Sequence, residues 1–164
     1  MSKTENNLLE AFSGESQTNR RYLAFAQRAE ADGFKQAAKL FRAAAEAEAI
    51  HAFNHLLALG GIKSTRENLE AAIRAETNAF ENRYPQMIKD AKAENNELAL
   101  RTFTFANETE KGHSLLYEKA LETLGNNPET DYYVCTVCGH TVEEEPPDEC
   151  PICRAMKKMY KKID

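Results

Sequence analysis

Apolar residues recur every three or four positions through most of the first 124 residues, which is the period of an amphipathic α-helix. The pattern predicts four helices: residues 3–32, residues 34–59, a third that begins at 65, and a fourth that follows the turn at 95–96 and ends at 124. Pro85 should kink the third helix, because it removes one backbone hydrogen bond and crowds the preceding turn. Four helices joined by short turns are typical of a helical bundle.

Each predicted helix carries an ionisable residue on its apolar stripe, where a solvated side chain would not lie. The second and fourth helices each contain a Glu-x-x-His motif, whose two members share one helix face. The first and third helices each contain a single inward glutamate. The six residues are Glu15, Glu48, His51, Glu76, Glu110 and His113. The two motifs lie 62 residues apart, so the chain consists of two similar helical hairpins.

Four carboxylates cannot be buried without counter-charges, because each would cost several kcal/mol. Two divalent cations balance four carboxylates, and two neutral imidazoles complete the ligand set of a dimetal site in a four-helix bundle. Oxygen and nitrogen ligands with redox chemistry favour iron, with manganese as a substitute. The alternative is a salt-bridged polar core. We expect His55 to pack beside the site rather than bind metal, and Glu46 and Glu108 to be solvated.

The four cysteines lie close together near the end of the chain, as two Cys-x-x-Cys pairs. They are Cys135, Cys138, Cys150 and Cys153. Two such loops form a closed tetrahedral thiolate shell, which holds zinc or iron. Tyr132-Tyr133 before the first pair and Pro151 within the second resemble rubredoxin and favour iron. The predicted domains are a bundle over 1–126, a linker over 127–131 and a four-cysteine domain over 132–164.

Composition limits the kinds of partner and the cellular location that we expect for this protein. The net charge of −5, without a basic cluster before Lys157-Lys158, argues against nucleic acid. No apolar run approaches the ~18 residues of a membrane helix, and the first residues lack the character of a signal peptide. Cysteines clustered for metal binding suit a reducing compartment. We therefore expect a cytoplasmic protein without a membrane partner.

The two motifs in series resemble the rubrerythrin family over nearly all of the 164 residues. The resemblance implies an all-α, ferritin-like four-helix bundle with a di-iron centre, followed by a rubredoxin-like domain with one iron, for which zinc is the alternative. It implies reduction of hydrogen peroxide to water in oxidative stress defence. Electrons would come from a separate NAD(P)H-dependent rubredoxin reductase and pass through the four-cysteine iron to the bundle.

The resemblance also implies roles for eight bundle residues: bridging carboxylates, terminal carboxylates, histidine ligands, and tyrosines beside the ligands. The bridging carboxylates would be Glu48 and Glu110, and the terminal carboxylates Glu15 and Glu76. The histidine ligands would be His51 and His113, and the neighbouring tyrosines Tyr22 and Tyr84. Two positions depart from the family. Ala79 stands where a further glutamate usually exchanges with the first histidine as one iron changes oxidation state. Arg154 stands where the second cysteine loop usually has glycine.

Two other functions fit the pattern less fully. A ferroxidase or iron-handling protein of the ferritin kind would use the same six ligands, and Ala79 favours that alternative. A zinc-ribbon interaction module on a redox-inert bundle would need zinc in the four-cysteine site.

The turn between the second and third helices predicts a domain-swapped homodimer. The resemblance implies that these two helices run parallel within one bundle, so the connection must return along it over ~33 Å. The six steps from Leu59 to Thr65 reach at most ~21 Å. The alternatives are that several turns of helix unwind, or that a simple alternating bundle uses the short turn and abandons the parallel pairing of the family. In the simpler, swapped arrangement each di-iron centre would take Glu15, Glu48 and His51 from one chain and Glu76, Glu110 and His113 from its partner.

Overall fold

The structure is a computed structural model that describes residues 1–164. Its elements are α1 (Lys3–Ala31), α2 (Lys35–Ala58), α3 (Thr65–Asn78), η1 (Ala79–Arg83), α4 (Tyr84–Ala93), α5 (Glu97–Glu122), β1 (Tyr132–Cys135), β2 (Thr141–Glu143), η2 (Lys157–Met159) and β3 (Tyr160–Ile163). They form two compact units, Met1–Lys63 and Ser64–Asp164, and each is described by itself.

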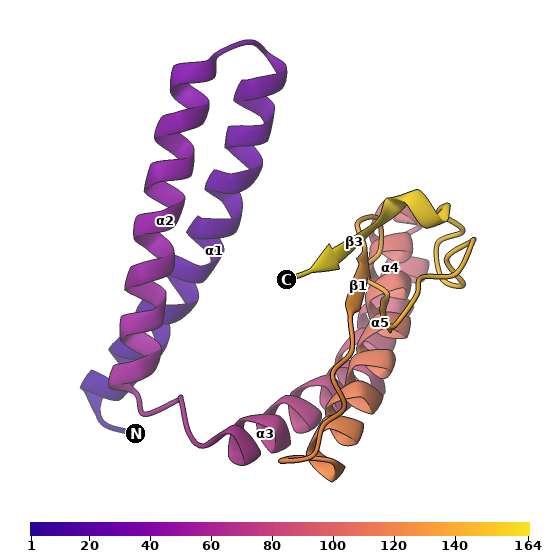
Figure 1. Cartoon of the computed structure of the whole chain (residues 1–164). Helices are drawn as coiled ribbons and strands as arrows, with labels where there is room; N and C mark the ends of the chain where they lie inside the picture. Colours follow the sequence, from indigo (N-terminus) through magenta and orange to yellow (C-terminus); the bar gives the residue numbers. More distant parts are fainter. The chain divides into compact units, whose positions relative to one another are not determined.

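The first unit is an antiparallel hairpin of α1 and α2 (Figure 1). Ser2 and Glu5 form a capping box at the start of α1, and Gly33 makes the turn with φ 85°, as its predicted stop requires. The fully buried residues of this hairpin are all alanines, which allow close approach of the helices: Ala26, Ala29, Ala38, Ala45 and Ala52. Larger apolar side chains on the hairpin remain exposed, including Leu40 at 69%. The apolar stripe predicted for α2 is therefore wider than the surface that α1 covers.

In the second unit, α3 and α4 pack along α5, and a π-helical turn, η1, joins them. The predicted capping box opens α3, where the side chain of Ser64 accepts a hydrogen bond from the backbone of Glu67. The predicted kink at Pro85 takes the form of this wider turn, which lies just before the proline. Pro85 itself sits at the first turn of α4, where a missing N–H is tolerated.

The four-cysteine domain is a small antiparallel sheet with strand order β2-β1-β3. It packs on α5 of the same unit through specific polar contacts. The Thr109 hydroxyl on α5 shares its one hydrogen between the Phe105 carbonyl oxygen at 2.7 Å and the Cys138 carbonyl oxygen at 3.1 Å, and Lys119 pairs with Glu143 on β2. These contacts fix the first cysteine loop against the helix that carries the second Glu-x-x-His motif.

The predicted fold class is confirmed: four helical segments of the bundle class precede a three-stranded domain with four clustered cysteines. The predicted domain boundaries at residues 126 and 132 stay a prediction, because the compact units divide the chain between the hairpins instead. None of the helices combines the length and apolar character needed to cross a lipid bilayer.

Candidate metal centres

The α1–α2 hairpin brings three predicted ligands together. Possible ligand atoms of Glu15, Glu48 and His51 all lie within 4.8 Å of one another. The i, i+3 spacing places His51 Nδ1 3.1 Å from a Glu48 carboxylate oxygen. Both carboxylates are half-buried, whereas the His51 side chain is 55% exposed within its unit.

The second unit repeats this arrangement with Glu76 from α3 and Glu110 and His113 from α5. His113 Nδ1 lies 2.9 Å from a Glu110 carboxylate oxygen. Burial raises the pKa of Glu76, and repulsion from Glu110 raises it further. The raised pKa reflects a partly buried carboxyl group beside a second carboxylate, and a bound cation would favour the charged form of both.

Each cluster thus offers two carboxylates and one imidazole, which is a donor set suited to iron or manganese. The residues fit the metal ions that the sequence predicted, because the three predicted ligands of each hairpin lie together. Assembly of the two triads into one six-ligand dimetal centre stays a prediction, and so do the individual ligand roles.

The other residues singled out by sequence lie outside the clusters. Tyr22 stacks in an aromatic group with Phe25 and Phe41, at centroid distances of 6.2 and 6.0 Å. Tyr84 lies near Phe103, with a centroid distance of 6.4 Å. Both tyrosines are half-buried, and their catalytic role stays a prediction.

Replacement of a cluster glutamate is expected to release bundle metal selectively. Glu48→Ala and Glu110→Ala should each lose metal from the bundle, because a lone imidazole and one carboxylate hold a divalent ion weakly, while the tetrathiolate keeps its own. Glu46→Ala and Glu108→Ala are matched controls, since both glutamates are exposed and lie two residues before a cluster glutamate. Metal analysis of the purified variants measures the difference, and full bundle occupancy in Glu48→Ala or Glu110→Ala would contradict the assignment.

The four cysteine sulfurs have the geometry of a metal site rather than of disulfides. Sγ atoms of Cys135 and Cys153 lie 3.7 Å apart, and those of Cys138 and Cys150 lie 3.6 Å apart. A tetrahedron with metal–sulfur bonds of ~2.3 Å has edges of roughly 3.8 Å, whereas a disulfide would bring two sulfurs to ~2.05 Å. The thiolate shell is therefore spaced for one ion.

Hydrogen bonding to one sulfur favours its thiolate form. Burial alone would raise the pKa of Cys150, but donors from the backbone of Cys153 and Ile152 and from the Tyr160 hydroxyl lower it to about 6. His140 Nδ1 lies 2.7 Å from that hydroxyl. Donors to sulfur of this kind tune iron–thiolate centres.

Arg154 has φ 63°, so the second cysteine loop does require a positive φ at this position. Arg154→Gly should stabilise the four-cysteine domain by about 1 kcal/mol, because a side chain is disfavoured in the left-handed region. The rate of metal loss from the tetrathiolate to a chelator measures the effect. Glu149→Ala is the control, since it removes the Arg154–Glu149 ion pair without changing the backbone. Faster metal loss in Arg154→Gly than in this control would contradict the prediction.

The sequence reasoning missed two threonines that join the domains. Thr109 and Thr141 occupy ordinary helix and strand positions, so no periodicity marks them. The only sequence signal was proximity, since Thr109 precedes Glu110 and Thr141 follows Cys138 by three residues.

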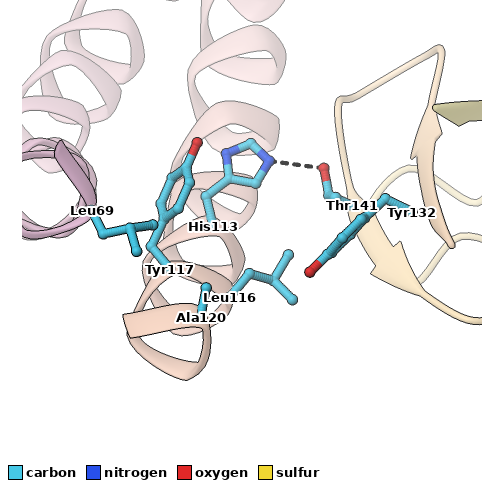
Figure 2. A pocket seen from close by; sticks show the side chains of 7 residues that line it. All are labelled: Leu69, His113, Leu116, Tyr117, Ala120, Tyr132 and Thr141. Carbon is cyan, nitrogen blue, oxygen red and sulfur yellow. Dashed lines mark hydrogen bonds between the residues drawn. The ribbon is translucent and has the colours of Figure 1, made fainter. Parts of the chain in front are cut away.

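A cavity of about 350 Å³ lies beside His113 in the second unit. Leu69, Leu116, Tyr117, Ala120, Tyr132 and Thr141 complete its lining (Figure 2). The lining is largely apolar, and its polar groups come from His113, Tyr117, Tyr132 and Thr141.

Comparisons with known proteins agree with these sites. Residues 6–121 match the rubrerythrin family model, and residues 133–161 match the model of the rubrerythrin rubredoxin-like domain. Rubrerythrin-2 of Clostridium acetobutylicum is 32% identical, over 93% of this chain and 92% of its own length. Rubrerythrin of Porphyromonas gingivalis is also 32% identical, over 93% and 86%.

A solved structure of nigerythrin in its fully reduced, all-ferrous state is 28% identical, with a TM-score of 0.61 over 99% of this chain and 88% of that one. The chain spans most of each relative, and both of its metal-binding parts fall within the matched segments. Two carboxylate–histidine clusters, a four-cysteine site and these matches lead to one conclusion: the chain belongs to the rubrerythrin family.

Proposed function

We propose that this protein is a non-haem di-iron peroxidase that reduces hydrogen peroxide to water in oxidative stress defence. The observation that carries the proposal is the presence, in one chain, of two carboxylate–histidine clusters and a thiolate shell spaced for a single metal ion. Family membership supports the activity, and the all-ferrous nigerythrin structure supports iron as the metal.

Each turnover consumes two electrons and two protons and cleaves the O–O bond of peroxide, and iron held by the six ligands would supply the electrons. The chain's own residues hold and shield that site. The family resemblance supports bridging carboxylate roles for Glu48 and Glu110 and terminal carboxylate roles for Glu15 and Glu76. A largely apolar pocket lies beside His113. Tyr22 and Tyr84 are proposed to lie next to the ligands and support the reaction.

The four-cysteine iron is proposed to relay electrons from a separate NAD(P)H-dependent rubredoxin reductase. The contacts of its first loop support this role. Cys138 would supply one of the four thiolates, and its carbonyl oxygen lies 3.1 Å from the hydroxyl of Thr109, the residue before Glu110. A short through-bond connection therefore links the two kinds of site within one chain.

Anaerobic reduction followed by stopped-flow mixing tests the function. The reduced protein is expected to be reoxidised much faster by stoichiometric hydrogen peroxide than by dioxygen, at both kinds of centre. A ferroxidase would instead turn over added Fe²⁺ with dioxygen and gain little from peroxide. The presence of Ala79, where the family usually has a further glutamate, favours this second function, because it leaves a symmetric set of six ligands.

The same residue gives a prediction about iron movement. Ala79 is fully buried at the start of η1, so no carboxylate is available there to replace His51. His51 is expected to stay bound in both oxidation states. Crystal structures of oxidised and chemically reduced protein measure this, and an iron shift away from His51 beyond roughly 1.5 Å, the rise of one helical residue, would contradict it.

A further inference from the structure

The two ring nitrogens of His113 face different partners. Nδ1 lies 2.9 Å from a Glu110 carboxylate oxygen, within the metal-binding cluster. Nε2 lies 2.9 Å from Thr141 Oγ1, which belongs to the four-cysteine domain (Figure 2). The ring thus spans the distance between the bundle cluster and strand β2.

The hydroxyl of Thr141 is positioned to accept a hydrogen bond from the imidazole. This hydroxyl has one hydrogen, and the Gly139 carbonyl oxygen, 3.0 Å away, is an acceptor for it. With a metal on Nδ1, the neutral ring would carry its proton on Nε2, and Oγ1 would accept that proton in a hydrogen bond. The lone pair of Nδ1 would then be directed toward the metal.

That arrangement suits a metal between Nδ1 and Glu110. A hydrogen bond from a protonated Nδ1 accounts for the 2.9 Å spacing in the absence of a metal, and a bound cation would take the place of that proton.

The loop that leads to Thr141 contacts α5 as well. Gly139 has φ 87° in the first cysteine loop, and Thr109 Oγ1 on α5 lies 3.1 Å from the neighbouring Cys138 carbonyl oxygen. The first cysteine loop therefore meets α5 close to the Thr141–His113 contact. For His51, the equivalent histidine, Nδ1 lies 3.1 Å from a Glu48 carboxylate oxygen, and its side chain is 55% exposed within its unit.

We propose that Thr141 is a positioning residue for the bundle site. By accepting the Nε2 proton of His113, it fixes the tautomer and orientation of that ring, so that metal affinity in the bundle depends on a hydroxyl of the four-cysteine domain. The proposal rests on the metal-binding part of the proposed function and is independent of peroxide turnover.

Three variants of the full chain separate this role from simple packing. Thr141→Val removes the acceptor and keeps the shape, and Thr141→Ser keeps the acceptor. Thr136→Val is the matched control, because it removes a hydroxyl of the same domain that bonds to the Met159 carbonyl instead. Circular dichroism and the tetrathiolate absorption verify folding of each variant.

Anaerobic competition for Fe²⁺ against a colorimetric chelator is the first measurement. Loss of a partner that orients a metal-bound histidine typically lowers affinity 10–100-fold, so Thr141→Val should bind bundle iron about that much more weakly. Thr141→Ser and Thr136→Val should match the parent. Equal affinity in Thr141→Val and the parent, or an equal loss in Thr141→Ser and Thr141→Val, would overturn the proposal.

Proton-detected ¹⁵N spectra of the zinc-loaded protein report the tautomer directly. The His113 resonance, assigned by its loss in His113→Gln, should carry its proton on Nε2 in the parent and in Thr141→Ser, with that proton exchanging faster in Thr141→Val. A proton on Nδ1 in the parent would also overturn the proposal. A parent that binds iron tightly but does not reduce peroxide would instead refute the proposed function alone.

Discussion

Mixed dimers of Glu48→Ala and Glu110→Ala subunits are expected to recover bundle metal that neither variant binds alone. We propose that helices α1 and α2 of one protomer share a dimetal centre with α3 and α5 of another. In such a heterodimer one site carries both lesions and the other carries none. Recovery should therefore approach one intact centre per mixed dimer.

The length of the α2–α3 connection supports this exchange. Helix α2 ends at Ala58 and α3 begins at Thr65, in agreement with the bounds expected from sequence. A return of ~33 Å along a bundle with these two helices parallel exceeds the ~21 Å that the connection can reach. Exchange between protomers removes the conflict without unwinding either helix.

The experiment needs mixed dimers of verified composition. Two affinity tags, purified in sequence, isolate the heterodimer, and metal analysis with peroxide-driven reoxidation counts the intact centres. Mixing Glu48→Ala with tagged Glu48→Ala is the control and should show no recovery. No recovery in the true heterodimer would mean that each centre is built within a single chain.

Loss of the four-cysteine iron should abolish NAD(P)H-driven peroxide turnover while the bundle still reacts. In Cys150→Ser the relay lacks one of its four thiolates, so turnover with the reductase should fall to the rate of the reductase alone. A bundle reduced chemically should still be reoxidised by peroxide, because its six ligands are unchanged. Steady-state and single-turnover assays measure the two effects separately.

Zinc in the four-cysteine site is the matched control for this prediction. Zinc keeps the tetrahedral shell and the contacts of the domain with α5, but it has no redox chemistry. The zinc form should therefore be as inactive with the reductase as Cys150→Ser is. Undiminished turnover in the zinc form would show that electrons reach the bundle by another route.

Much of the fold was predictable because its signals are local. Periodicity and the turn residues Gly33, Gly60 and Asn95 predicted the helix ends within about two residues. Gly60 and Asn95 have positive φ values, as Gly33 does. The kink at Pro85 was predictable, but its form was not. Whether a helix accommodates a proline by bending or by a π turn depends on the packing around it.

For the candidate sites, residue type and helical phase predict which residues share one face of a helix, and they predict no contacts beyond that helix. Phase places Glu48 beside His51, because i and i+3 always share a face. Phase does not reveal which side chain faces the second nitrogen of His113, since Thr141 lies 28 residues away across a change of domain. It also overstates burial within one hairpin, because Leu40 lies on an apolar stripe and is still 69% exposed.

The alanine interior of the α1–α2 hairpin has a thermodynamic consequence. A methyl group buries little apolar surface, so the buried alanines offset only a small part of the entropy lost when the hairpin orders. A partner that covers the exposed large side chains of the hairpin would add stabilisation. If a second chain does so, unfolding is a bimolecular equilibrium, and the melting temperature rises with protein concentration. Dilution then acts as a denaturant, and a unimolecular free energy of unfolding is not defined for this protein.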